Sequence, residues 1–141
     1  MFQGSSALKF WLGLCMAQGK NRKLLSKRTR KGNKGFPVAT VAFYGPDNLR
    51  ASKVVCSIIK SDGVEAGPIK KWFTTADARR VESILGEVLS FINENSARSI
   101  VMIDQVFGCP HEEGIDYPEG ESCPDCLYWK NRDRYTQELI H

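Results

Sequence analysis

The feature that most constrains this chain is a group of cysteine and histidine residues in an acidic, turn-rich segment. The stretch CPHEEGIDYPEGESCPDC, residues 109 to 126, holds three of the five cysteines and one of the two histidines, with six acidic residues and no basic one. Such a segment has too little apolar surface to fold by burial alone. We therefore expect its structure to depend on a bound ion.

The spacing of these residues predicts a zinc loop over residues 109–129. A C-x-H pair and a C-x-x-C pair with zinc-knuckle spacing supply four candidate ligands: Cys109, His111, Cys123 and Cys126. Zn²⁺ favours four tetrahedral N and S ligands, and three thiolates with one imidazole make a closed structural set. The alternatives are unliganded thiols, a redox C-P-D-C pair and an iron–sulfur centre.

A likeness to the zinc deaminases is only partial. His111-Glu112-Glu113 and the later C-P-D-C resemble that family's H-x-E and P-C-x-x-C motifs, but Ser122 stands where the motif has proline. Cys109 would also occupy the coordination position that a catalytic water needs. We therefore expect a structural metal and no catalytic residue.

Length and cysteine usage indicate one cytoplasmic domain. The chain has 141 residues, and its odd number of clustered cysteines does not suit a secreted disulfide framework. Residues 1–15 form a poor secretion signal, because their apolar part is short. Leu14 also stands before Cys15, where lipoprotein processing requires a small residue. We expect them to be an extension before a natural start at Met16.

A basic segment dominates the first part of the chain. Eight cations and no acid lie between residues 20 and 34: Lys20, Arg22, Lys23, Lys27, Arg28, Arg30, Lys31 and Lys34. Subtracting these eight charges from the net charge of +4 leaves −4 for the remainder. Such a run repels itself, so residues 1–35 are predicted to be a disordered basic arm. Its expected partner is a nucleic acid, preferably RNA, or a ribonucleoprotein; a solvated tail and a membrane surface are the alternatives.

The following residues, 36–108, predict an α+β core. Apolar runs with β-branched and aromatic residues predict strands over 38–44, 52–60, 69–74 and 99–104. Helical periodicity predicts a helix over 76–94, with Thr75 as its N-cap. The order β-β-β-α-β implies a small mixed sheet, because the last strand must return parallel to an earlier one.

This order is shared with RNase H-like folds, so that topology is a possibility for the core. Nucleases of that class hold two metal ions with carboxylates on the first strand, the helix and the fourth strand. Here Asp104 fits one of those places, but the strand predicted over 38–44 has no acid. A hydrolase therefore stays an alternative, with Asp104, Glu113 and His111 as the residues to suspect.

Aromatic and basic residues follow the last cysteine. We expect Tyr128 and Trp129 to pack the zinc loop against the sheet. In the tail, residues 130–141, Arg132 and Arg134 are candidates for phosphate contacts.

The segments GCPHEEGIDYPEGE and C-P-x-C-x-x-W resemble a phrase of small bacterial proteins that also begin with a basic segment. The resemblance spans residues 16–129 and implies a bacterial cytoplasmic protein, without an activity. Together these patterns predict a non-enzymatic zinc-binding accessory protein that contacts nucleic acid or a ribonucleoprotein through its basic arm. An adaptor that binds proteins through the acidic loop is the alternative, and the loop is also a candidate dock for the protein's own arm.

Overall fold

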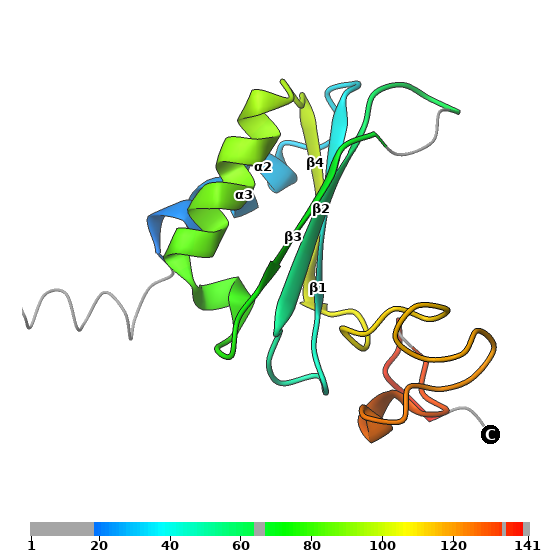
Figure 1. Ribbon diagram of the computed structural model, residues 1–141. Coiled ribbons are helices and arrows are strands. Elements are labelled where there is room, and N and C mark those ends of the chain that lie inside the picture. Colours follow the sequence, from blue (N-terminus) through cyan, green and yellow to red (C-terminus); the bar gives the residue numbers. More distant parts are fainter. Residues whose placement is uncertain (1–18, 64–66, 134, 140–141) are drawn as a thin grey trace, which may run out of the picture.

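The computed structural model describes residues 19–63, 67–133 and 135–139. It contains one four-stranded sheet with two helices on one of its faces (Figure 1). The strands are β1 (Val38–Tyr44), β2 (Lys53–Ile59), β3 (Ile69–Phe73) and β4 (Ser99–Val106), and the helices are α2 (Lys20–Arg30) and α3 (Glu82–Glu94). The predicted α+β class and the order β-β-β-α-β are confirmed.

Strand pairing gives the sheet the order β3-β2-β1-β4. β1 pairs antiparallel with β2 and parallel with β4, and β2 pairs antiparallel with β3, so the sheet is mixed as predicted. α3 is the crossover between β3 and β4, as a parallel connection requires. The parallel register shifts at Ala42/Phe43, where β4 carries extra residues before Val106.

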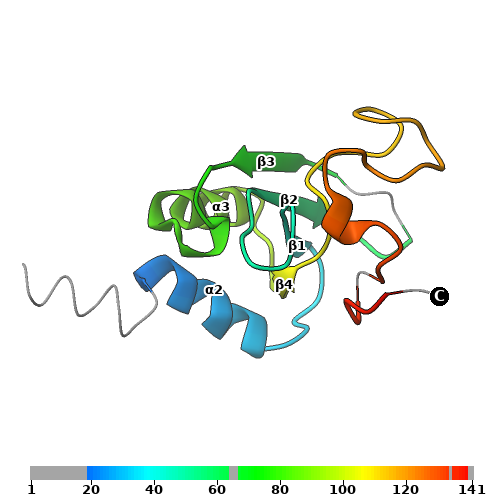
Figure 2. The same cartoon turned by 90° about the horizontal axis from the view of Figure 1, so that it is seen from below.

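The alternating pattern of the strands separates the two faces of the sheet. Residues on the helix side are buried, among them Ala39, Val41 and Phe43 of β1. They pack against the apolar side of α3, which buries Leu85, Val88, Leu89 and Ile92. Both helices lie on this side when the molecule is viewed from below (Figure 2).

The predicted start of the central helix is wrong. Thr75 caps no helix; a short 3₁₀ helix, Ala78–Arg80, comes first, and its N-cap Asp77 accepts a hydrogen bond from the Arg79 amide. Val81 is extended, so α3 begins at Glu82. The cap formed by Asp77 starts a separate 3₁₀ turn, so the continuous apolar period of the sequence did not predict where the helix begins.

The predicted disorder of the basic arm is also wrong for residues 20–30, which form α2. Leu25 is fully buried in the core beneath α3 and β4. The helix has no side-chain cap of its own; instead the carboxylate of Glu82 accepts hydrogen bonds from the amides of Asn21 at 2.9 Å and Arg22 at 3.3 Å. A carboxylate at this position also favours the positive end of the helix dipole.

Two arginines complete the docking of α2. Arg22 donates to both carboxylate oxygens of Asp104 on β4, at 2.5 and 2.7 Å, and Arg28 donates to the Asn93 side chain and the Ala97 carbonyl at 3.0 Å. These contacts span more than 60 residues of sequence, which is why local charge repulsion did not predict them. The predictions for residues 1–15 concern a segment outside the described residues.

The docking of α2 predicts different effects for two adjacent leucines. Leu25→Ala should lower the free energy of unfolding by about 2–5 kcal/mol, because it leaves a cavity in a closed core. Leu24→Ala is the matched control, since Leu24 is 41% exposed and should change stability by less than about 0.5 kcal/mol. Urea unfolding at equal metal content measures both; equal effects of the two variants would mean that α2 is not docked.

Candidate metal centre

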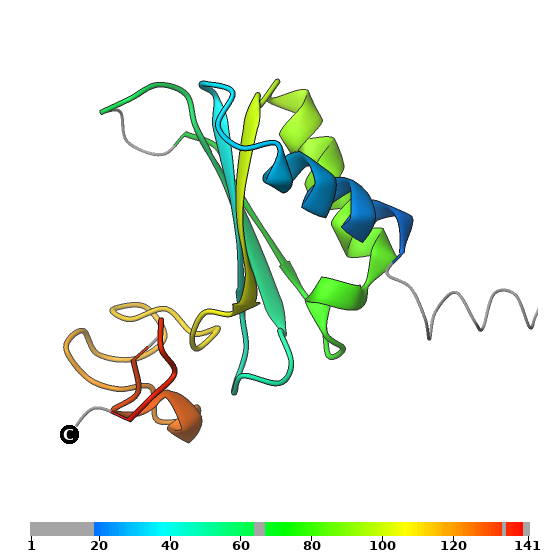
Figure 3. The ribbon, with the colours of Figure 1, turned by 180° about the vertical axis from the view of Figure 1, so that it is seen from behind.

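The four predicted ligands meet beyond the end of β4. The sheet places the first pair, because the Phe107 amide donates to Phe43 at 2.7 Å and the Gly45 amide donates to Gly108 at 2.8 Å. These bonds carry the β1–β4 pairing up to Cys109. The second pair lies directly before a 3₁₀ helix, Leu127–Trp129, whose Trp129 amide donates to the Cys126 carbonyl. Figure 3 shows the loop beyond the sheet, away from the helices.

Three sulfurs surround one ring nitrogen at this site. The Nδ1 atom of His111 lies 3.3 Å from the sulfur of Cys109, 3.4 Å from that of Cys123 and 3.5 Å from that of Cys126. All four ligand atoms lie within 4.8 Å of one another. With Zn–S near 2.3 Å and Zn–N near 2.0 Å, the N···S edge of a zinc tetrahedron is about 3.5 Å. The geometry therefore fits a tetrahedral metal centre.

The sulfurs are mostly buried, so protons compete with a cation for them. Cys123 and Cys126 are 7% and 3% exposed, and the His111 amide donates to the Cys109 sulfur at 3.2 Å. Burial raises the pKa of Cys109, and burial with the neighbouring Cys109 and Cys123 sulfurs raises the pKa of Cys126. Clustered thiols of this kind become thiolates when a divalent cation replaces their protons. Metal affinity should therefore fall as the pH is lowered.

Acidic side chains shape the loop between the two ligand pairs. The Glu112 amide donates to Asp116 and the Gly120 amide donates to Glu113, each at 2.6 Å. Gly114 and Gly120 have φ values of +84° and +88°, which a side chain would strain. Part of the predicted acidic surface thus closes turns within the loop.

Two lysines, Lys53 and Lys71, hold the first ligand pair on the sheet, which the sequence did not predict. Lys53 of β2 donates to the Pro110 carbonyl at 3.0 Å and lies 3.3 Å from Glu112, which also accepts from Lys71 of β3 at 2.7 Å. Hydrogen bonds from Lys71 and Lys53 lower the pKa of Glu112. The Lys53 side chain is only 5% exposed, although its strand position faces away from the helices. The loop itself covers it.

Trp129 provides the second attachment of the loop, as predicted. Its side chain packs against the core, and its indole N–H donates to the Gly45 carbonyl at 2.8 Å. Tyr128 instead contacts the ring of Trp129 edge-on and carries the Arg132 guanidinium 4.2 Å above its own ring. The metal loop is therefore fastened to both β1 and β2.

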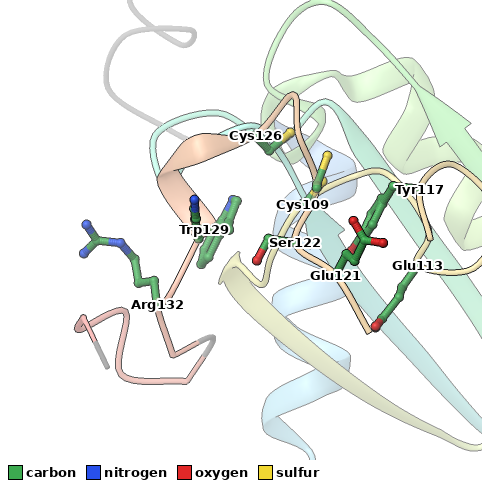
Figure 4. A pocket seen from close by; sticks show the side chains of 10 residues that line it. Cys109, Glu113, Tyr117, Glu121, Ser122, Cys126, Trp129 and Arg132 are labelled. Carbon is green, nitrogen blue, oxygen red and sulfur yellow. The ribbon is translucent and has the colours of Figure 1, made fainter. Parts of the chain in front are cut away.

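The site has a small pocket but no open coordination position. A cavity of about 210 Å³ adjoins Cys109, Cys123 and Cys126, and its other walls include Glu113 and Trp129 (Figure 4). Four protein ligands complete a tetrahedron, whereas catalytic zinc keeps one position for water or substrate. The arrangement suits a structural centre.

The remaining suspects for catalysis are engaged elsewhere. Asp104 pairs with Arg22, and Glu113 accepts the Gly120 amide. Within the described part of the chain, the cysteine–histidine group is the only set of three or more potential ligands close enough to hold a metal. The structure therefore offers no two-metal carboxylate site of the nuclease kind in residues 19–63, 67–133 and 135–139.

Of the ten predicted cations, six are exposed, three are hydrogen-bonded within the fold and one lies outside the described residues. The six exposed cations are Lys20, Lys23, Lys27, Arg30, Lys31 and Lys34. Arg22 and Arg28 turn inward to dock α2, and Arg132 donates to the carbonyls of Tyr128 and Gln137. Arg134 lies outside the described residues. α2 docks on α3 and β4 and not on the acidic loop, so the predicted docking of the arm on the loop is wrong for this helix.

Two cysteine variants test the centre. Cys123→Ser should lower the free energy of unfolding by several kcal/mol and abolish stoichiometric metal, since metal-binding energy is folding energy in such sites. Cys56→Ala is the control, because Cys56 is buried in the sheet core away from the ligand group and should keep the metal. Elemental analysis and chelator-dependent melting measure both; equal metal content in Cys123→Ser and the parent would remove Cys123 from the ligand set.

Comparisons with known proteins assign no family. The chain matches no protein-family model, and searches of curated proteins and solved structures give no significant match. No helix in the described part of the chain is long and apolar enough to cross a membrane. The geometry of the site and of α2 is therefore the basis for a functional proposal.

Proposed function

We propose that this chain is a non-enzymatic, zinc-stabilised accessory protein that binds nucleic acid, preferably RNA, or a ribonucleoprotein. The observation that carries the proposal is the distribution of charge on α2. Lys20, Lys23, Lys27 and Arg30 are exposed, and at 100° per residue they fall within an arc of about 80°. Leu25, Arg22 and Arg28 occupy the opposite side and dock the helix.

A docked helix presents its cations without having to order a flexible arm on binding. Ordering a disordered segment on binding costs conformational entropy. In α2, the contacts to Glu82 and Asp104 offset this cost when the protein folds, before any ligand binds. One cation per turn along one face can neutralise successive phosphates and release their counterions. These features support a polyanion as the ligand.

Zinc is the metal that the ligand set supports best. Three thiolates and one imidazole in tetrahedral array suit Zn²⁺. The centre would order the loop after β4 and supply no reaction, because no ligand position is left open. The resemblance to small bacterial proteins supports a bacterial cytoplasmic setting for this role.

A protein-binding adaptor is the second candidate. Ile115 and Leu127 are 77% and 70% exposed on the metal loop, among its acidic residues. A contiguous apolar patch is typical of protein contacts, and these two residues are the large apolar side chains that the loop exposes. Capture of the same cellular partners by a variant with a neutralised α2 face would favour this role.

Neutralising the exposed face of α2 tests the nucleic-acid proposal. The triple variant Lys20→Gln, Lys23→Gln, Lys27→Gln should bind a short labelled RNA more weakly. Its slope of log affinity against log salt should be shallower by about 2, since each lost phosphate contact removes about 0.7–0.9 from the slope. Fluorescence anisotropy at several salt concentrations gives both quantities.

The matched control neutralises three exposed lysines elsewhere, with Lys60→Gln, Lys70→Gln and Lys130→Gln. It has the same net charge and should keep most of the salt slope of the parent. Equal losses in the two triple variants would show that only net charge matters. That result would contradict a binding face on α2.

A further inference from the structure

An apolar groove lies between the C-terminal end of α2 and β4. Its volume is about 310 Å³, at the lower end of the range for small-ligand sites. The lining is mostly apolar and includes no acidic residue; its main members are Thr29, Gly32, Asn33, Val38, Val101 and Met102.

The groove runs along an open edge of the sheet. β4 is the last strand in the order β3-β2-β1-β4, so within the described residues its outer side pairs with no strand. Edge strands are usually protected by charge or proline, but Ile100 to Ile103 carry neither, and Val101 is 54% exposed. This edge therefore offers both apolar contact and backbone hydrogen-bonding groups to a ligand.

Four exposed cations are sequence neighbours of the residues that line the groove. Arg30, Lys31 and Lys34 adjoin the lining residues in sequence, and Arg98 directly precedes the lining residue Ser99. Arg98 lies beside the same segment, since its Nη1 would be 3.5 Å from a Cβ placed on Gly35. None of the four forms an ion pair within the described part of the chain. Their charges remain available to a ligand.

We propose that this groove holds an unpaired nucleobase whose flanking phosphates bind these four cations, so that the chain prefers single-stranded to duplex nucleic acid. The inference rests on the proposed nucleic-acid function and names its ligand class. Unpaired bases can be splayed into apolar sites and bonded through their edges, whereas paired bases cannot. Four unpaired cations favour a polyanion over a peptide strand at this edge.

Asn33 gives the groove a polar group for a base edge. Its side-chain oxygen accepts from the Gly35 amide at 2.8 Å and lies 3.2 Å from the Ser99 hydroxyl, whose single proton has a nearer acceptor in the Gly35 carbonyl at 2.8 Å. The bond from the Gly35 amide orients the side chain, and its amide nitrogen has no hydrogen-bond partner within the described residues. A fixed amide donor beside an apolar surface can bond a base acceptor.

Two exposed edge residues provide the test. Val101→Ser removes apolar surface from the groove without changing charge, and Ile69→Ser is the matched control on the opposite edge strand, since both residues are 54% exposed. Anisotropy with full-length protein would compare labelled single-stranded oligouridylate, oligothymidylate and a duplex, each about 12 residues long, within the usual site sizes. The RNA and DNA arms show which backbone is preferred.

The parent protein should bind a single strand more tightly than the duplex. Val101→Ser should weaken single-strand binding about fivefold, the effect of losing about 40 Å² of apolar contact, and leave duplex binding and the salt slope unchanged. Ile69→Ser should change none of these. Equal single-strand affinity in Val101→Ser and the parent would overturn the groove while leaving the α2 proposal intact; a parent that binds no probe would overturn both.

Photo-crosslinking gives a measurement that needs no variant. With 4-thiouridine in the single strand, crosslinks are expected in the peptides that contain residues 29–34 and 98–102. Crosslinks confined to the metal loop or to the exposed side of α3 would contradict the proposal.

Discussion

The order of the segment after β4 depends on one constraint: three thiols and an imidazole are gathered around a single point beyond the end of that strand. The loop that carries them buries few apolar side chains. Between residues 109 and 126, the only buried residues are Cys123 and Cys126. Apart from a bound cation, only a few hydrogen bonds and the packing of Trp129 offset the entropy of ordering this segment. Lys53 and Trp129 fasten the loop to the sheet, and the four clustered side chains could hold a metal ion.

A second constraint fixes the basic helix. Glu82 and Asp104 come from α3 and β4, and both bind the first turn of α2. They neutralise part of its charge and turn the remaining cations outward. The acidic loop lies beyond one end of the sheet, on the side away from the helices (Figures 1 and 3). The exposed cations of α2 and the acidic residues of the loop therefore lie on different sides of the molecule.

The sequence predicted features that local patterns determine. The bounds of β1 follow from a mostly apolar run that mixes β-branched and aromatic residues, and the ligand group follows from spacing alone, because each pair is held by a short turn. α2 was missed because one buried leucine and two distant carboxylates outweigh its local repulsion. Lys53 was missed because its alternation predicts an exposed side chain, and only the folded loop covers it. Contacts between residues far apart in sequence leave no local pattern.

The most direct test of the central claim is X-ray absorption spectroscopy of the purified, reduced protein at its metal edge. We expect the metal to be zinc, with three sulfur neighbours at about 2.3 Å and one nitrogen neighbour at about 2.0 Å. A protein without stoichiometric metal, or a metal coordinated mainly by oxygen, would contradict it.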